Sequence, residues 1–293
     1  MAKSLIRNLD CALCAFDARG HVNSAVSVWG AEPCASPAEV AAKSDIVITM
    51  LPDDAAVKAV ACGPGGVLES ARSGMVLMDF STIGPWTIQE INERFASSGA
   101  RVFGGAVTLG VKAAIEGKLA VYLDDKAAEN PVLAQVVGGF SSSITATAGL
   151  GSSKVIKLIN NLLVGVNVAA TAEAVALAEK AGLPANILVP LILKGSGSSY
   201  ALANHIAVSA MEGDLGVGKF GVDYILKDLD LVLELAKRSE HTTFFGALGM
   251  SAYRGAKAMG FGANYYPVVL RWMEHAAAQD SAEQKTQGKE LVA

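Results

Sequence analysis

The sequence predicts an α/β protein in which a doubly wound parallel sheet is followed by an all-helical domain. The chain has 293 residues, which is the length of about two domains. Over the first half, short apolar runs alternate with helix-length segments, a pattern typical of βαβ units. The second half has helical periodicity with few strand-like runs. We therefore expect domains at residues 1–150 and 151–293, joined by a long helix.

The expected strands of the first domain are short and apolar. The run Asp45–Leu51 is almost continuously apolar, as in a parallel strand covered on both faces. Pro85 begins one of the helices, a position where the missing N–H of proline is harmless. Further strands are expected at Ala12–Phe16, Met75–Phe80, Arg101–Val107 and Leu119–Leu123, and helices at Pro37–Lys43, Asp54–Ala61, Pro85–Ser97 and Asn130–Val136.

The second half begins with the longest expected helix, from Ser153 to Ala181, which ends at Gly182. Its segment Leu158–Ala172 carries no charge but is too short to span a membrane and contains three asparagines. We expect it to be buried. Further helices are expected at Ala185–Lys194, Ser199–Glu212, Val222–Arg238, Thr242–Met259 and after Pro267, and the polar end from Gln279 is expected to fray.

The composition of the chain indicates which kinds of binding partner to expect. Hydrophobic residues make up 52% of the chain and charged residues 18%, which favours large buried surfaces, including one between subunits of a dimer or tetramer. The net charge of −4 gives no basic surface for nucleic acid or for an anionic membrane. The first residues lack the apolar stretch of a signal peptide, so we expect a cytoplasmic protein. Cys11 and Cys14 form a CxxC, but residues three apart on a strand face opposite ways, so we expect no metal there.

A dinucleotide-binding domain normally opens with a strand, a GxGxxG turn and a helix. This chain instead begins with residues that resemble the rest of that first helix, and the next strand ends at Asp17. We expect the first strand and its glycine turn to be missing. Either the chain starts at an internal methionine of a longer reading frame, which we favour, or it is a true truncation. In both cases we expect these residues alone to bind dinucleotide weakly.

Several motifs follow one another along the chain. They are VITMLPDD at Val47–Asp54, DFSTIGP at Asp79–Pro85, GGAVTLGVKAAIEGKL at Gly104–Leu119, GSSKVIKLINN at Gly151–Asn161 and KDL at Lys227–Leu229. In this order, between Ala35 and Lys237, they resemble the β-hydroxyacid dehydrogenase family. The resemblance implies a Rossmann-type NAD(P)-binding domain, an all-helical domain for substrate binding and dimerisation, and an active site in the cleft between them.

The resemblance also implies which residues hold the cofactor. Met50, Leu51 and Pro52 follow a strand whose end lies against the cofactor, and ligands sit at the carboxyl ends of parallel strands. Thr82 would lie near the nicotinamide, although Ser81 and Thr82 could also simply cap the next helix. Asp17 would bind a free ribose 2′-hydroxyl, which favours NAD. Arg19 could instead meet the 2′-phosphate of NADP.

The substrate carboxylate is expected at the third motif. In the family pattern D-A-P-V-S-G-G, the serine hydroxyl and the backbone N–H groups after it hold that carboxylate. Thr108 keeps a hydroxyl at the serine position, and Gly110 keeps the second glycine. Leu109 replaces the first glycine, and Gly104 and Ala106 replace Asp and Pro, so substrate identity can differ from that of the family.

The fourth motif carries the family's catalytic lysine, here Lys157, and a substrate-binding amide, here Asn161. Residues four apart lie on one face of a helix. A lysine can accept the hydroxyl proton while hydride leaves the carbinol carbon. The alternative is a lysine whose stem merely covers apolar surface. Lys227 is expected to approach cofactor and substrate from the helical domain, unless it belongs to a solvated charged face.

These residues predict an NAD(P)-dependent oxidoreductase for a small β-hydroxy acid or its semialdehyde or keto form. An imine reductase is one alternative, which the retained Lys157 disfavours. A catalytically silent relative that serves as an interaction module is another. The missing glycine turn favours that second alternative, whereas the Lys157–Asn161 pair disfavours it.

Overall fold

The computed structural model describes residues 1–278, except for the side chains of residues 21–24 and 210–212. The end from Gln279, which was expected to fray, lies outside these residues. The chain divides into two compact units, Met1–Leu158 and a second that begins at Ile159. The division falls inside the long helix α9 (Ser152–Lys180).

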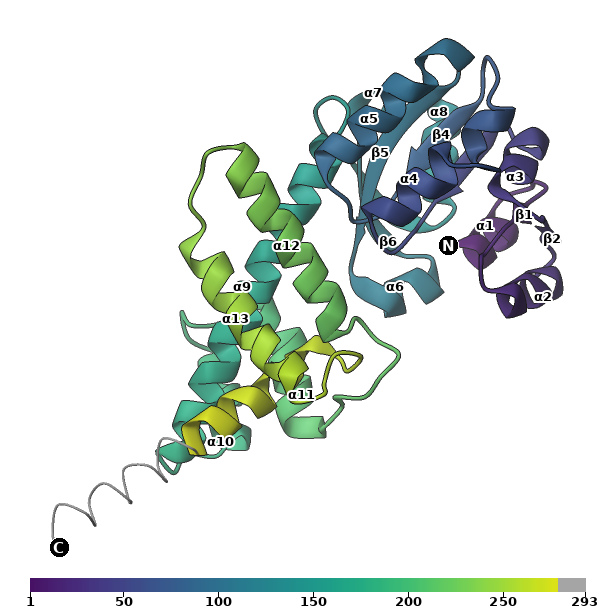
Figure 1. The fold of residues 1–293 in the computed structure, drawn as a ribbon. Helices are drawn as coiled ribbons and strands as arrows, with labels where there is room; N and C mark the ends of the chain where they lie inside the picture. Colours follow the sequence, from purple (N-terminus) through teal and green to yellow (C-terminus); the bar gives the residue numbers. More distant parts are fainter. Residues whose placement is uncertain (279–293) are drawn as a thin grey trace, which may run out of the picture. The chain divides into compact units, whose positions relative to one another are not determined.

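The first unit contains a five-stranded sheet in the order β3-β4-β5-β6-β7 (Figure 1). Its strands are β3 (Ile46–Thr49), β4 (Val76–Asp79), β5 (Arg101–Thr108), β6 (Leu119–Leu123) and β7 (Ser141–Ala146). The pairings are parallel, as predicted, except that β6 runs antiparallel to β5. The ten residues between these two strands are fewer than a crossover between parallel strands needs, so the chain turns back on itself.

Helices cover both faces of this sheet, which confirms the doubly wound class. Alternate residues of a strand point to opposite faces. Val76 and Met78 pack into a cluster with Leu5 and Leu133, from α1 and α8, while Leu77 packs into a second cluster with residues of α3, α4 and α5. All four residues of β4 are buried, as the apolar run predicted. The helices of this unit are α1 (Ala2–Asn8), α2 (Gly20–Val28), α3 (Pro37–Lys43), α4 (Asp54–Cys62), α5 (Pro85–Phe95), α6 (Gly110–Glu116), α7 (Asp125–Ala128) and α8 (Pro131–Gly138).

A second, two-stranded sheet pairs β1 (Cys14–Ala15) with β2 (Glu32–Pro33) in parallel. Within the described residues, neither strand pairs with β3. Helix α3 contacts both β1 and β3, and the Cys14 thiol lies 3.3 Å from the Ser44 hydroxyl just beyond α3. The described residues thus form two sheets, and β1 and β2 belong to a different sheet from β3.

Several elements were not predicted. The strand β7 was missed because its sequence, SSSITA, is polar and its side chains are mostly exposed. The strand β2 has only two residues, and α6 was taken as part of the substrate-binding loop because it lies within the third motif and begins at Gly110. The expected strand Ala12–Phe16 shrinks to the two residues of β1.

The second unit is helical, as predicted. Beyond α9 it contains α10 (Ala185–Ile192), a π-helix (Leu202–Ile206), α11 (Ala207–Glu212), α12 (Val222–Arg238), α13 (Phe244–Ala258) and a final helical segment that begins at residue 269. The described residues also contain 3₁₀ turns at Val67–Ser70 and Ala96–Ser98 in the first unit and at Tyr266–Val268 in the second. The bounds of α12 match the prediction at both ends.

Helix α9 supplies one side of the second core. Val168 and Ala172 are fully buried in a cluster with Ile225 and Leu229 of α12, and the Tyr253 hydroxyl of α13 donates to the carbonyl of Gly165 at 2.9 Å. Among the described residues, α9 alone is long and apolar enough to cross a membrane. The core helix of a soluble protein meets the same criteria, so length and composition by themselves do not identify α9 as a membrane-spanning helix.

Close packing between β4 and β5 predicts the effect of one substitution. A Cβ atom at Gly105 would lie 2.3 Å from a ring carbon of Phe80, whose ring stands edge-on to Phe140 at 5.4 Å. Gly105→Ala should therefore lower the free energy of unfolding by about 1–3 kcal/mol, through overpacking. Gly138→Ala is the control, because nothing lies within 4 Å of a Cβ there. Chemical denaturation measures both, and equal stability of the two variants would contradict this packing.

Candidate active site

A buried carboxylate joins the ends of two parallel strands in the first unit. Asp79, the last residue of β4, is fully buried and accepts hydrogen bonds from the Thr49 hydroxyl at 2.6 Å and the Ser81 hydroxyl at 2.8 Å. The Ser81 hydroxyl in turn accepts from the N–H of Leu51 at 2.9 Å. The loops after β3 and β4 are therefore fixed to one another. These loops carry the predicted cofactor residues Met50 to Pro52 and Thr82.

The ammonium of Lys154 completes this network from the first turn of α9. Its side chain is fully buried, and its Nζ atom lies 2.7 Å from the Asp79 carboxylate. Nζ also donates to three carbonyl oxygens, of Asp79 at 2.7 Å, Ser81 at 2.9 Å and Gly105 at 2.8 Å. Burial lowers the pKa of Lys154, whereas the Asp79 carboxylate raises it. Four oxygen acceptors around one group favour its cationic form.

A second buried carboxylate, Asp124, lies at the start of α9. It accepts from the Ser153 hydroxyl at 2.8 Å and from the backbone N–H groups of Gly104, Gly151 and Ser153. Negative charge is favoured at a helix N-terminus. Burial raises the pKa of Asp124, and these hydrogen bonds lower it. A Cβ atom at Gly104 would lie 2.8 Å from the Asp124 carboxylate, so a family-like Asp at position 104 would not fit beside it.

The predicted cofactor residues lie in two separate places of the first unit. Met50 and Pro52 are exposed and Thr82 is half-buried, all at the carboxyl ends of β3 and β4. Asp17 follows β1 in the two-stranded sheet and is half-buried. Both of its carboxylate oxygens accept from the Arg19 guanidinium, at 2.9 Å each. Asp17, expected to bind the ribose of NAD, and Arg19, the alternative partner for the 2′-phosphate of NADP, thus contact each other.

The predicted carboxylate-binding loop follows β5. Thr108 is half-buried, and Leu109 and Gly110 are exposed. Leu109 has a φ of 78° and Gly110 a φ of 74°, which is left-handed backbone. Leu109 therefore adopts a backbone conformation that favours glycine, although its side chain disfavours it. The loop thus has a glycine-like backbone with an exposed leucine side chain.

Lys157, the predicted acid/base, lies on α9 one turn beyond Lys154 and is half-buried. It belongs to the first unit, together with Thr82 and Thr108. Asn161 follows one turn later on the same continuous helix. Residues at this spacing share one helix face.

In the second unit, two predicted residues meet at a carboxylate that the sequence analysis did not single out. Asp228 is 1% exposed and accepts from the Asn161 amide at 2.5 Å. Its other oxygen forms an ion pair with Nζ of Lys227 at 2.8 Å. Asn160 donates to the Asn161 amide oxygen at 3.0 Å. Asn161 and Lys227 are thus held together by Asp228, and Lys227 is not simply a solvated surface lysine.

The buried charges Asp79, Asp124, Lys154 and Asp228 were missed as site residues. Each lies inside or beside a quoted motif, but an isolated Asp or Lys in a sequence is most often exposed. One feature of the sequence could have identified Lys154: it lies three residues before Lys157, at the start of an otherwise apolar helix.

The GxGxxG spacing does occur in the chain, at Gly216–Gly221, and was also missed. It lies between α11 and α12, not after a strand. The first N–H groups of α12 are already bonded, Val222 to the carbonyl of Asn264 and Asp223 to that of Gly262. They are not free to bind a phosphate, so this loop does not serve as a dinucleotide-binding turn.

One histidine has a partner that its sequence position did not suggest. Nδ1 of His205 lies 2.7 Å from the Tyr265 hydroxyl, 60 residues away in the sequence. Burial lowers the pKa of His205 and raises the pKa of Tyr265 to about 12. Both groups are therefore neutral near pH 7, and they hold the π-helix against the 265–266 segment.

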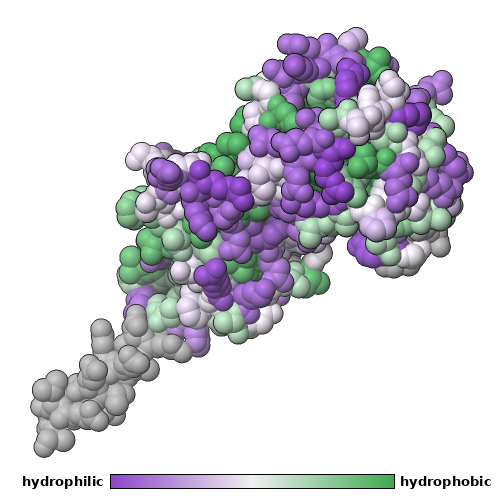
Figure 2. Space-filling view, turned by 45° about the horizontal axis from the view of Figure 1, so that its top comes forward, coloured by the Kyte–Doolittle hydropathy of each residue, from purple (hydrophilic) through white to green (hydrophobic). Residues whose placement is uncertain are grey.

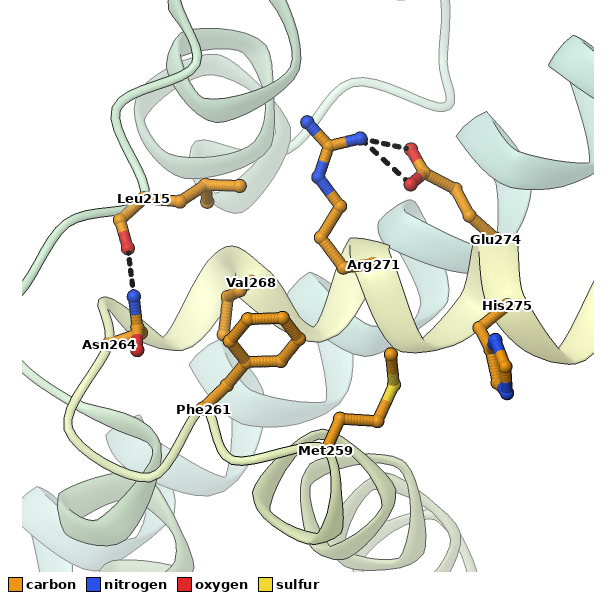
Figure 3. Close-up of a pocket in the computed structure, with 8 residues that line it drawn as sticks. All are labelled: Leu215, Met259, Phe261, Asn264, Val268, Arg271, Glu274 and His275. Atoms are coloured by element: carbon orange, nitrogen blue, oxygen red, sulfur yellow. Dashed lines mark hydrogen bonds and ion pairs between the residues drawn. The ribbon is translucent and has the colours of Figure 1, made fainter.

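A cavity of about 600 Å³ in the second unit contains none of the predicted site residues (Figure 3). Arg271 points toward Glu274 there and donates to both of its carboxylate oxygens, at 2.8 and 3.2 Å. Its charge is thus neutralised within the cavity wall. A smaller cavity, of about 360 Å³, lies between α9 and α10 and also lacks predicted site residues. Size alone does not identify the active site.

Comparison with known proteins decides the family. Residues 1–149 match the NAD-binding domain of 6-phosphogluconate dehydrogenase, and residues 151–272 match a domain described as NAD-binding of NADP-dependent 3-hydroxyisobutyrate dehydrogenase. The chain is 33% identical to 2-(hydroxymethyl)glutarate dehydrogenase of Eubacterium barkeri over 260 residues, which cover 89% of this chain and 86% of the relative. The chain belongs to the β-hydroxyacid dehydrogenase family. The predicted class, an NAD(P)-dependent hydroxyacid dehydrogenase, is confirmed.

Other members of the β-hydroxyacid dehydrogenase family are more distant. L-threonate dehydrogenase of Cupriavidus necator is 27% identical and covers 92% of this chain and 91% of its own. The solved structure of 3-hydroxyisobutyrate dehydrogenase from Salmonella typhimurium has a TM-score of 0.80 at 25% identity, and covers 92% of this chain and 94% of its own. An imine reductase from Myxococcus stipitatus, at 13% identity, a TM-score of 0.61 and coverage of 93% and 94%, shares the fold alone.

The strained loop yields a prediction. A non-glycine residue in left-handed conformation costs about 1–3 kcal/mol, whereas glycine loses about 0.5–1 kcal/mol more conformational entropy on folding. Leu109→Gly should therefore raise the free energy of unfolding by about 1 kcal/mol, measured by denaturation. Val111→Gly is the control, since Val111 lies inside α6 and should lose stability. A destabilised Leu109→Gly variant would show that the leucine side chain contributes more than its strain costs.

Proposed function

We propose that this dehydrogenase interconverts a small β-hydroxy acid and its semialdehyde or keto form, with Lys157 as general acid and base. In the oxidative direction the C–H hydrogen leaves the carbinol carbon as hydride, and Lys157 accepts the hydroxyl proton. In reduction Lys157 returns that proton. The nicotinamide of the bound cofactor supplies the hydride acceptor or donor. A positioned acid/base group contributes about 10²–10⁴ in rate.

The other site residues would hold the substrate. The Thr108 hydroxyl and the N–H groups that follow it, including that of Gly110, would bind the carboxylate, because they lie at the end of β5 in an exposed glycine-like turn. Asn161 would donate to the substrate from α9, and Lys227 would add a cation near it. Both would keep their orientation through Asp228.

The observation that carries this proposal is the shared carboxylate. Asp228 is buried and engages an amide from α9 and an ammonium from α12, both of which the family motifs had selected independently. A buried charge is costly unless it is paired. A silent interaction module would have no need of such a buried carboxylate with its amide and ammonium partners, which disfavours that alternative. The retained Lys157 likewise disfavours imine reduction.

We propose NAD as the preferred cofactor. The residues described fit the two ends of a dinucleotide, with Asp17 after β1 for the adenosine ribose and Thr82 after β4 for the nicotinamide, whereas no glycine turn follows a strand to hold the pyrophosphate. The Asp17 carboxylate already accepts from Arg19, which reduces the charge that Arg19 offers to a 2′-phosphate. A free ribose hydroxyl remains the better partner for this pair.

Replacement of Lys157 tests the mechanism. In Lys157→Ala, turnover should fall about 10²–10⁴-fold, because no group remains to exchange the proton. Dinucleotide affinity should change little. Turnover is measured by nicotinamide absorbance with 3-hydroxyisobutyrate, 2-(hydroxymethyl)glutarate and L-threonate, and affinity by calorimetry.

Lys180→Ala is the matched control, since Lys180 is an exposed lysine at the far end of the same helix. It should keep wild-type turnover. Wild-type turnover in Lys157→Ala would overturn the assignment of the acid/base. Absence of dinucleotide-dependent turnover of any of the three acids by the wild-type chain would instead argue against the activity itself.

We further propose a cytoplasmic homo-oligomer, a dimer or tetramer, formed through the helical unit. Exposed apolar side chains follow helical spacing on α9, at Ile156, Ile159 and Leu163. Phe244, Phe245 and Leu248 of α13 are 73%, 71% and 68% exposed. Figure 2 shows hydrophobic residues at the surface of this unit among hydrophilic ones. Large exposed apolar patches mark interaction sites.

Light scattering coupled to size exclusion tests this assembly. The wild-type chain should elute as a dimer or tetramer, and Phe245→Glu should shift it toward monomer because a charge would be buried in the interface. Val28→Glu is the control, since Val28 is an equally exposed apolar residue of the first unit, at 84%. A monomeric wild-type protein would rule the proposal out.

A further inference from the structure

The mechanism above makes no use of the most deeply buried cation of the first unit. Lys154 is 0% exposed, and its Nζ atom lies within 2.7–2.9 Å of four oxygen atoms. An ammonium has three N–H donors. All of them are therefore engaged, and the group has no path to solvent. Lys154 is a fixed charge and not a second acid/base.

The four oxygens come from three segments of the same unit. Two belong to Asp79 at the end of β4, one to Ser81 directly before Thr82, and one to Gly105, three residues before Thr108 in β5. Lys154 itself lies on the first turn of α9, three residues before Lys157. A single cation therefore links the turn that carries the proposed acid/base to the two loops proposed to face nicotinamide and carboxylate.

Stability alone is a weak explanation for such a pair. Removing two charges from water is costly, and well-packed apolar residues often stabilise a protein as well as a buried ion pair does. The pair also fixes orientation, because each N–H···O bond holds one backbone carbonyl in a set position relative to α9. Catalytic groups have to be held within a fraction of an ångström, and an error of about 1 Å can cost about 10²-fold in rate.

We propose that Lys154 is a positioning residue, which together with Asp79 fixes the Ser81–Thr82 loop and the end of β5 relative to the turn of α9 that carries Lys157. This inference rests on the proposed function. It assigns Lys154 no contact with substrate or cofactor.

Two variants test the proposal: Lys154→Met and the double variant Lys154→Met/Asp79→Asn. Lys154→Met leaves the Asp79 carboxylate buried without its cation, so it should be less stable than the double variant, which contains no unpaired buried charge. In both Lys154→Met and the double variant, the kcat of the folded protein should fall about 10- to 100-fold. KM for the acid and Kd for the dinucleotide should change less than about threefold. The isotope effect on kcat with deuterated substrate should rise, because hydride transfer becomes slower than other steps.

The double variant separates positioning from folding, even if Lys154→Met fails to fold. If the pair only stabilised the fold, a stable double variant would regain wild-type kcat, and that result would overturn the proposal. Leu133→Ala is the control for general destabilisation, since Leu133 is buried in the first unit on α8 and makes none of the hydrogen bonds to Lys154 or Asp79. It should lose stability but keep the wild-type isotope effect and kcat per folded molecule.

Amide hydrogen exchange tests the proposal without turnover. Peptides that cover residues 81–84 and 105–110 should exchange faster in the double variant than in Leu133→Ala at equal stability. Unchanged exchange would refute the positioning role, whatever the enzyme does. If the wild-type chain shows no dinucleotide-dependent turnover, the proposed function fails, and faster exchange would still support Lys154 as the group that holds these loops.

Discussion

The first unit depends on one ammonium group surrounded by oxygen. Lys154 brings a positive charge into a buried region, and three of its four acceptors lie at or just after the carboxyl end of β4, while the fourth lies within β5. Such strand ends are where α/β proteins bind ligands, because the loops that follow them converge. The charge of Asp79 balances the cation, and the hydroxyl groups of Thr49 and Ser81 satisfy the remaining lone pairs.

The same arrangement recurs in the helical unit with the charges reversed. There the buried group is a carboxylate, Asp228, and its partners are the Asn161 amide and the Lys227 ammonium. In both units, the residues that family motifs associate with substrate or cofactor lie next to a buried charge that those motifs do not assign. A flexible polar side chain keeps one orientation only when its partner is itself fixed, and burial fixes both Asp79 and Asp228.

Departures from the family pattern have a structural counterpart in this chain. Gly104 stands where the family has Asp, and the Asp124 carboxylate lies so close to it that a larger residue would not fit. Leu109 stands where the family has Gly, and the backbone keeps the left-handed conformation nonetheless. At this position the loop therefore has a left-handed backbone together with an exposed leucine side chain.

The sequence by itself determined the fold class, the long helix and the family. Apolar periodicity distinguishes strands from helices, and the ordered motifs select Lys157, Asn161 and Lys227. Only the tertiary structure revealed the antiparallel turn to β6, the separate two-stranded sheet and the partners Lys154, Asp79, Asp124 and Asp228. The local pattern of apolar residues indicates the secondary structure of a segment. Which charges become buried together depends on contacts between residues as far as 75 positions apart, and no local periodicity records them.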